Sequence, residues 1–207
     1  MIKDQSVAVF LDALASKAPT PGGGGAAAIM GAMGAALVSM VCTLTLGKEK
    51  YAAVDDEMRA LLAEAERLRT TLTDEIAADA AAFDRVMAAY GLPKGDDAEK
   101  AARTAAIQGA LRTATEVPLA CARICAAVIA LSGRAAEIGN LNVISDAGVA
   151  VMAAYAGLKS AALNVYINVG AIKDASFASA ARATIDALVA QGETAMPEIY
   201  ARVKNKL

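Results

Sequence analysis

The feature that most constrains the fold is a long segment without charged residues, from Gly22 to Leu46. It begins with four glycines and continues mainly with alanine, glycine, serine and methionine. A segment of this length is sufficient to span a bilayer. However, it lacks the aromatic residues that flank membrane helices, and its small residues make it only weakly hydrophobic. We therefore interpret it as a buried helix from about Ala26 to Leu46, in which Gly31 and Gly34 let a neighbouring helix approach closely.

A second segment, from Ala147 to Ile172, is also nearly free of charge and is interrupted by Lys159. Apolar residues make up 57% of the sequence but aromatic residues only 4%. Alanine, which supplies most of this excess, favours helices over strands. A long amphipathic pattern from Met58 to Met87 predicts a further helix with one charged, solvated face. The sequence therefore predicts an all-α fold, a multi-helix bundle with two nearly uncharged buried helices.

We expect one domain over residues 1–207, because this length is usual for a single domain and the sequence has no internal repeat. Ser6 and Asp174 are expected to cap the first and last helices. Pro118 is expected to kink a helix or to begin a new one. Two helices almost free of charge need burial on nearly all sides, which a domain of this size achieves with difficulty alone. A homodimer is therefore expected.

The residue counts exclude several classes of function. The chain contains no histidine, which excludes Ser-His-Asp triads, Cys-His pairs and histidine-based zinc sites. Cys121 and Cys125 lie one helical turn apart, and without a carboxylate cluster beside them we interpret them as buried apolar residues rather than metal ligands. The net charge of -2 gives no general attraction to nucleic acid or anionic lipid. The N-terminal segment is amphipathic and does not resemble a signal peptide.

A turn with two prolines leads into the glycines at the start of the first uncharged helix. Pro19 and Pro21 end the preceding helix, because each disfavours the α conformation of the residue before it. Glycine runs often form flexible linkers, but this one leads directly into a buried helix, whose first N–H groups can contact a ligand. It is not a dinucleotide-binding motif, because no strand precedes it, and Glu49 after Lys48 excludes a P-loop. We predict a ligand-binding turn formed by Gly22, Gly23, Gly24 and Gly25.

A group of polar residues precedes the second uncharged segment and contains Asn140, Asn142, Ser145 and Asp146. Helix capping accounts for Ser145 or Asp146 but not for the whole group. The positive end of a helix dipole stabilises a carboxylate at Asp146. Such a carboxylate suits either contact with a cationic substrate or acceptance of a proton.

Other polar residues interrupt apolar helix faces. Asp79 is either a functional carboxylate or a residue at a solvated edge. Asn164, one turn before Asn168, either forms a hydrogen bond between helices or contacts a ligand. Candidates for binding a carboxylate-bearing tail, with a solvated surface position as the alternative, are Lys48, Lys50, Tyr51 and Arg103.

Several of these motifs together resemble the formimidoyltetrahydrofolate cyclodeaminase and methenyltetrahydrofolate cyclohydrolase family. The similar stretches, in the same order as in the family, are Pro19–Ala28, Gly47–Tyr51, Asp79–Lys94, Gly139–Ala150 and Ala161–Val169. One departure is Gly25, where the common family pattern has serine after three glycines. This glycine and the absence of a fused formiminotransferase domain both favour the cyclohydrolase branch.

The resemblance implies an all-α homodimer in the cytoplasm that acts on a folate. We expect no cofactor, metal, nucleic acid or membrane to be involved. The expected reaction is hydrolysis of 5,10-methenyltetrahydrofolate to 10-formyltetrahydrofolate. The alternatives are a cyclodeaminase that releases ammonia and a folate-binding helical protein without activity. Asp146 or Asp79 would serve as the base. Lys48 would donate a proton to N5 or pair with the glutamate tail, and the glycine turn with Asn140 and Asn164 would hold the pterin or the developing oxygen.

Overall fold

The computed structural model describes residues 4–207, and within this range it contains helices and no strand. This confirms the predicted all-α fold. The helices are α1 (Val7–Leu14), α2 (Gly23–Thr43), the short 3-10 helix η2 (Glu49–Val54), α3 (Asp55–Tyr90), α4 (Asp97–Ile138), the 3-10 helix η3 (Leu141–Val143), α5 (Ile144–Val169) and α6 (Ala175–Lys204).

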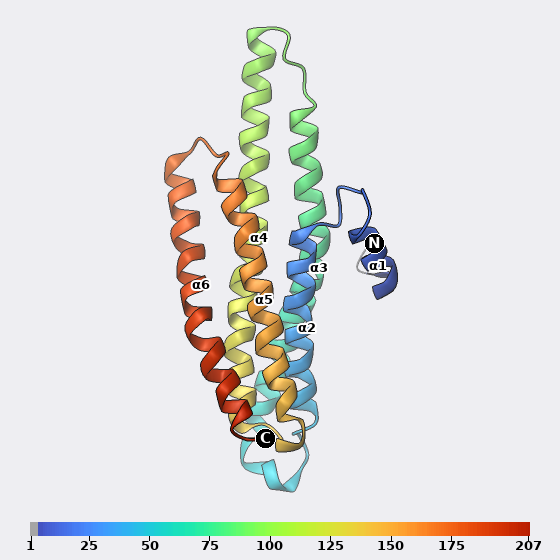
Figure 1. Ribbon diagram of the computed structural model, residues 1–207, viewed down its shortest axis with the longest axis vertical. Coiled ribbons are helices and arrows are strands. Elements are labelled where there is room, and N and C mark those ends of the chain that lie inside the picture. The colour runs from blue at the N-terminus through green and yellow to red at the C-terminus, as the bar shows by residue number, and fades with distance from the viewer. Residues whose placement is uncertain (1–3) are drawn as a thin grey trace.

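The helices α2 to α6 run side by side along the long axis of an elongated bundle (Figure 1). Helix α5 packs against α2, α4 and α6, while α2 also packs against α3. The joined ends of α3 and α4 extend beyond the rest of the bundle, and α1 lies to one side (Figure 1). The N-terminus of α2 therefore lies part of the way along the bundle, beside α3, and not at its tip.

Local sequence signals account for the helix boundaries. Ser6 accepts a hydrogen bond from Val9 N–H, and Asp174 accepts one from Phe177 N–H, so both predicted N-caps are confirmed. Pro118 lies inside α4, which continues through it as one helix from Asp97 to Ile138. Of the two outcomes expected for this proline, a new helix is thus wrong.

The small residues of α2 and α5 permit very close packing between these two helices. A Cβ atom added at Gly34 would lie 2.9 Å from the carbonyl oxygen of Ala150, and one at Gly157 would lie 2.9 Å from that of Ala27. Side chains larger than glycine would separate the helices at both points. The predicted close approach of a second helix to α2 is confirmed.

The faces of α2 and α5 that point away from the bundle core are exposed in the single chain. We call this surface the outer face and define it by Met33, Met40, Val149, Met152, Leu163 and Ile167, whose exposed fractions range from 42% to 75%. The two helices are therefore buried on one side only, whereas the sequence suggested burial on nearly all sides. By length and composition alone, α2, α4 and the segment Leu141–Val169 are apolar enough to cross a membrane.

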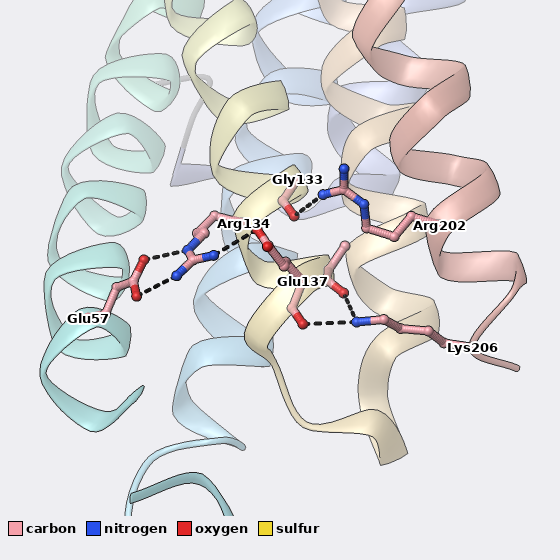
Figure 2. A network of polar contacts seen from close by, with 7 residues as sticks. Glu57, Gly133, Arg134, Glu137, Arg202 and Lys206 are labelled. Atoms are coloured by element: carbon pink, nitrogen blue, oxygen red, sulfur yellow. Dashed lines mark hydrogen bonds and ion pairs between the residues drawn. The ribbon is translucent and has the colours of Figure 1, made fainter. Parts of the chain in front are cut away.

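At the end of the bundle near the C-terminus, charged side chains join α3, α4 and α6 (Figure 2). Arg134 binds both carboxylate oxygens of Glu57 and also donates to Glu137 at 2.7 Å. Lys206 donates to the carbonyl oxygens of Ala136 and Glu137, at 2.7 and 2.9 Å. These carbonyls belong to the last turn of α4 and have no partner within the helix, so Lys206 satisfies them.

Candidate functional site

The glycine turn and Asp79 are brought together at the N-terminus of α2. The carboxylate of Asp79, on α3, accepts a hydrogen bond from Gly25 N–H at 3.0 Å. A Cβ atom at Gly24 would overlap the Asp79 carboxyl group, so glycine is required there for the contact. Two motifs that are far apart in the sequence therefore form one unit, in which the Gly25 N–H group at a helix start holds a carboxylate.

Beside this unit lies a cavity of about 320 Å³, which we call the outer pocket. Its volume is at the lower limit of cavities that hold small organic ligands. Four polar side chains, those of Thr20, Asp79, Asn164 and Asn168, line a wall that is otherwise mostly apolar. The complete lining consists of Pro19, Thr20, Gly22, Gly23, Gly24, Asp79, Ala82, Phe83, Val86, Ala114, Asn164, Ile167 and Asn168.

Both asparagines use their amide N–H groups within the protein. Asn164 donates to Ser160 O at 2.9 Å, and Asn168 donates to Ala114 O at 2.6 Å. These bonds fix the orientation of each amide and leave its oxygen available to accept a hydrogen bond. Of the two alternatives for these residues, the bond between helices holds for Asn168, which joins α5 to α4, while the Asn164 bond stays within α5.

Burial raises the pKa of Asp79, and the hydrogen bond from Gly25 N–H partly offsets this rise. One turn earlier on α3, Glu75 is also half-buried, and its pKa is raised by burial and by the charges of Asp79 and Asp74. Sequence reasoning missed Glu75. The signal that could have identified it is its i, i+4 spacing from Asp79, which places both carboxyl groups on one side of α3.

The polar group Asn140, Asn142, Ser145 and Asp146 lies at the other end of α2, with Lys48 and Tyr51. Asn140 is 3% exposed, and its amide donates to Leu44 O at 2.8 Å and accepts from Asn142 N–H at 3.1 Å. Tyr51 accepts a hydrogen bond from Leu141 N–H at 3.0 Å. Asn140 and Tyr51 thus hold the corner before α5 in place.

The two polar groups are not brought together within one chain. They lie at opposite ends of α2, whose 21 residues extend about 30 Å at 1.5 Å per residue. Lys48 and Ser145 are exposed and Asp146 is half-buried. Arg103 belongs to neither group, because it donates to Tyr90 O where α3 and α4 extend beyond the bundle.

The three cysteines, Cys42, Cys121 and Cys125, are buried free thiols, which confirms the interpretation of Cys121 and Cys125 as buried residues. Among residues 4–207, no three acidic or cysteine side chains are grouped so that they could hold a metal ion. Acid–base chemistry in the outer pocket would therefore depend on the Asp79 carboxylate.

Comparison with known proteins gives three consistent similarities. A family model described as formiminotransferase-cyclodeaminase matches residues 6–187. The chain is 58% identical to the methenyltetrahydrofolate cyclohydrolase of Methylorubrum extorquens over the full length of both proteins. It is 35% identical to the formimidoyltransferase-cyclodeaminase of Rattus norvegicus, over 92% of this chain but only 35% of that protein.

A solved structure shares the fold. The crystal structure of formiminotetrahydrofolate cyclodeaminase from Thermotoga maritima superimposes with a TM-score of 0.82 at 32% identity, covering 100% of this chain and 98% of that one. The similarity therefore extends over the whole bundle.

Proposed function

The chain belongs to the formiminotransferase-cyclodeaminase family, and on this basis we propose that it is a soluble, cytoplasmic methenyltetrahydrofolate cyclohydrolase. The observation that carries the proposal is the 58% identity, without truncation on either side, to a cyclohydrolase. The substrate is a folate with a cationic one-carbon bridge between N5 and N10. The outer pocket offers that cation a half-buried carboxylate, Asp79, in a mostly apolar wall.

In the proposed reaction, Asp79 acts as the base. Water attacks the bridge carbon, a C–O bond forms, and one water proton passes to the carboxylate. The bond between the bridge carbon and N5 then breaks as N5 receives a proton, and the hydroxyl oxygen loses its proton to become the formyl oxygen. The net products are 10-formyltetrahydrofolate and one proton. The hydrogen bond from Gly25 N–H fixes the Asp79 carboxyl group for this step.

The test follows the near-ultraviolet absorbance of methenyltetrahydrofolate with purified protein, against a control without enzyme. We expect protein-dependent loss of the absorbance, and we expect Asp79→Asn to reduce kcat at least about 100-fold. The structural similarity to a cyclodeaminase supports a second candidate, in which N10 attacks a formimino carbon on N5 and ammonia leaves. Formation of the methenyl compound from the formimino compound, without hydrolysis, would support this candidate. Binding without either reaction would support a folate-binding protein.

We further propose that the protein is a homodimer formed through the outer face. Its six defining residues are apolar and exposed on two neighbouring helices, and surfaces of this kind are usually buried in an interface. Lys159, the charged residue in the middle of α5, is turned away toward α6, where it pairs with Glu193 at 2.6 Å. A second copy of the same face is therefore the partner that fits this surface.

An antiparallel arrangement of the two copies would also complete the site. The outer face runs between the two polar groups. The glycine turn with Asp79 lies at one end, and Lys48 with Asn140 and Asp146 lies at the other. A twofold axis through its middle places each end against the opposite end of the partner. The partner's Lys48 and the partner's Asp146 would then face the outer pocket, where Lys48 could protonate N5 or bind the glutamate tail.

Mixed dimers test this arrangement. Asp79→Asn and Lys48→Met are each expected to abolish turnover, and both sites of each pure dimer carry one defect. In a random mixture, half of the dimers contain both variants, and one of their two sites is then intact. The mixture should recover about a quarter of wild-type activity. No recovery from mixed dimers of confirmed composition would refute the shared site, and a monomer in detergent-free solution would refute the dimer.

A further inference from the structure

A small inner cavity lies behind the outer pocket, and Asp79 belongs to both. Its volume is about 10 Å³, about the minimum that can hold one water molecule. Apart from Asp79, the polar groups on its wall are the Glu75 carboxyl group and the Cys121 thiol. The rest of the lining consists of Gly24, Ala27, Ala28, Val117, Pro118 and Ala161.

The two carboxyl groups have different surroundings. Oδ2 of Asp79 accepts the hydrogen bond from Gly25 N–H, near the positive end of α2. Oε2 of Glu75 is buried and has no hydrogen-bond partner among the described residues. A buried carboxylate without a partner is far more costly than a buried neutral acid. Asp79 is therefore the member that ionises more readily, and Glu75 is the member that retains its proton.

The charged and titratable groups facing Glu75 also favour a protonated Glu75 beside an ionised Asp79. From its own helix, Asp79 and Asp74 raise the pKa of Glu75, and burial, the largest cause, raises it further. From α4 it meets Cys121, whose thiol pKa is itself raised, chiefly by the hydrogen bond with Cys125 and by burial. The lining contributed by α2 and α5 is glycine and alanine. The groups that act on Glu75 thus disfavour its negative charge.

We propose that Glu75 is a positioning residue of the site, a neutral carboxylic acid one turn from Asp79 that leaves Asp79 as the single negative charge that this chain itself presents to the outer pocket. Two ionised carboxylates one turn apart in a cavity of low polarity would repel, and the proton would then be shared between them. With Glu75 neutral, Asp79 remains a carboxylate that can contact a substrate with one positive charge. This consequence rests on the proposed function, whereas the neutrality of Glu75 does not.

The first test measures the Tm of the unliganded protein against pH for wild type and Glu75→Gln, which replaces the neutral acid by a neutral isostere. A carboxyl group with a raised folded-state pKa loses stability as pH rises above its ordinary value of 4.5. Glutamine has no such loss. The Tm difference, variant minus wild type, should therefore increase by about 3–5 °C per pH unit until Glu75 ionises.

Two controls make the result specific. Glu198→Gln changes an exposed glutamate on α6 and should give a Tm difference that is independent of pH. In an Asp79→Asn background the repulsion is absent, so Glu75→Gln should gain less at high pH than in wild type. A flat Tm difference for Glu75→Gln would mean that Glu75 is ionised in the folded protein and would overturn the proposal.

The second test measures kcat and KM for methenyltetrahydrofolate hydrolysis. A neutral Glu75 predicts that Glu75→Gln keeps turnover within about threefold of wild type at pH 7 and keeps the acidic limb of the pH profile, which belongs to Asp79. A loss of about 100-fold with native Tm would overturn the proposal, because Glu75 would then have to exchange its own proton. An inactive wild type would refute the proposed function, while the Tm measurement would still decide the state of Glu75. If Glu75→Gln does not fold, Glu75→Leu replaces it in both tests.

Discussion

The close packing of α2 on α5 places the glycine turn beside Asn164, and Gly157→Ala tests it directly. A Cβ atom there would lie 2.9 Å from Ala27 O and 3.0 Å from both Gly31 N and Cys125 Sγ. Two of these atoms are backbone atoms of α2, which cannot move without displacing the helix. Overpacking of this kind costs about 1–3 kcal/mol, and we expect the upper end of this range.

The same substitution also has a stabilising effect, because alanine is favoured over glycine in a helix by about 1 kcal/mol. The expected net loss for Gly157→Ala is therefore about 2 kcal/mol, which lowers Tm by about 4–8 °C. Gly109→Ala is the matched control, because Gly109 is an exposed residue inside α4 whose added Cβ would meet no atom within 4 Å. It should raise Tm by about 2–4 °C through helix propensity alone.

The assay is thermal unfolding followed by circular dichroism, with urea unfolding for the free energy, at one fixed protein concentration because dimerisation would affect both. The opposite signs of the two substitutions are the decisive result. If Gly157→Ala stabilises the protein as much as Gly109→Ala does, the two helices are not in contact at this point, and the explanation of the small residues in α2 is refuted.

Three further predictions concern the site, the core and the outer face. Gly24→Ala places a Cβ atom on the Asp79 carboxyl group, so turnover should fall at least about 100-fold in the absorbance assay, and unchanged turnover would contradict the role of Asp79. Leu72→Ala truncates a fully buried side chain and should lower the free energy of unfolding, measured in urea, by about 2–5 kcal/mol. A loss below about 1 kcal/mol would mean that the core around Leu72 is not closely packed. Met40→Glu introduces a charge into the outer face and should convert a dimer into a monomer with reduced turnover, as measured by light scattering and the absorbance assay; a stable, fully active dimer would exclude this face from the interface.

Some of the structure follows from local sequence rules and was predictable. The caps at Ser6 and Asp174 depend on one side chain and the next turn of helix, and the small residues of α2 need no knowledge of their partner. The place of the glycine turn was predictable because prolines end one helix immediately before a buried one begins. The pairing of this turn with Asp79 depends on how α2 packs against α3, and this packing could not be derived from the sequence motifs.

Other features depend on tertiary contacts and could not be predicted. Glu75 follows Thr73 and Asp74 on a helix with a solvated face, so it resembles an exposed glutamate. Its spacing from Asp79 places it on the same side of α3, but only the contact with α2 and α4 buries it. Asn140 was a candidate for binding the substrate, whereas its amide donates to Leu44 O and accepts from Asn142 N–H. The separation of the two polar groups results from the length of α2, which the motifs themselves do not specify.

The lack of histidine is compatible with the proposed reaction because the substrate itself carries the positive charge. The one-carbon bridge of the substrate is already a cation, so the protein need not supply an acid to activate it toward water. What remains is a base that stays ionised while largely buried, and the hydrogen bond from Gly25 N–H together with the helix dipole of α2 supports such a carboxylate at Asp79. A second charge beside it would weaken this arrangement, since it would favour protonation of Asp79. The neutral state proposed for Glu75 and the required glycine at position 24 thus serve one requirement: the chain itself supplies one carboxylate, at a fixed position, to face a single positive charge.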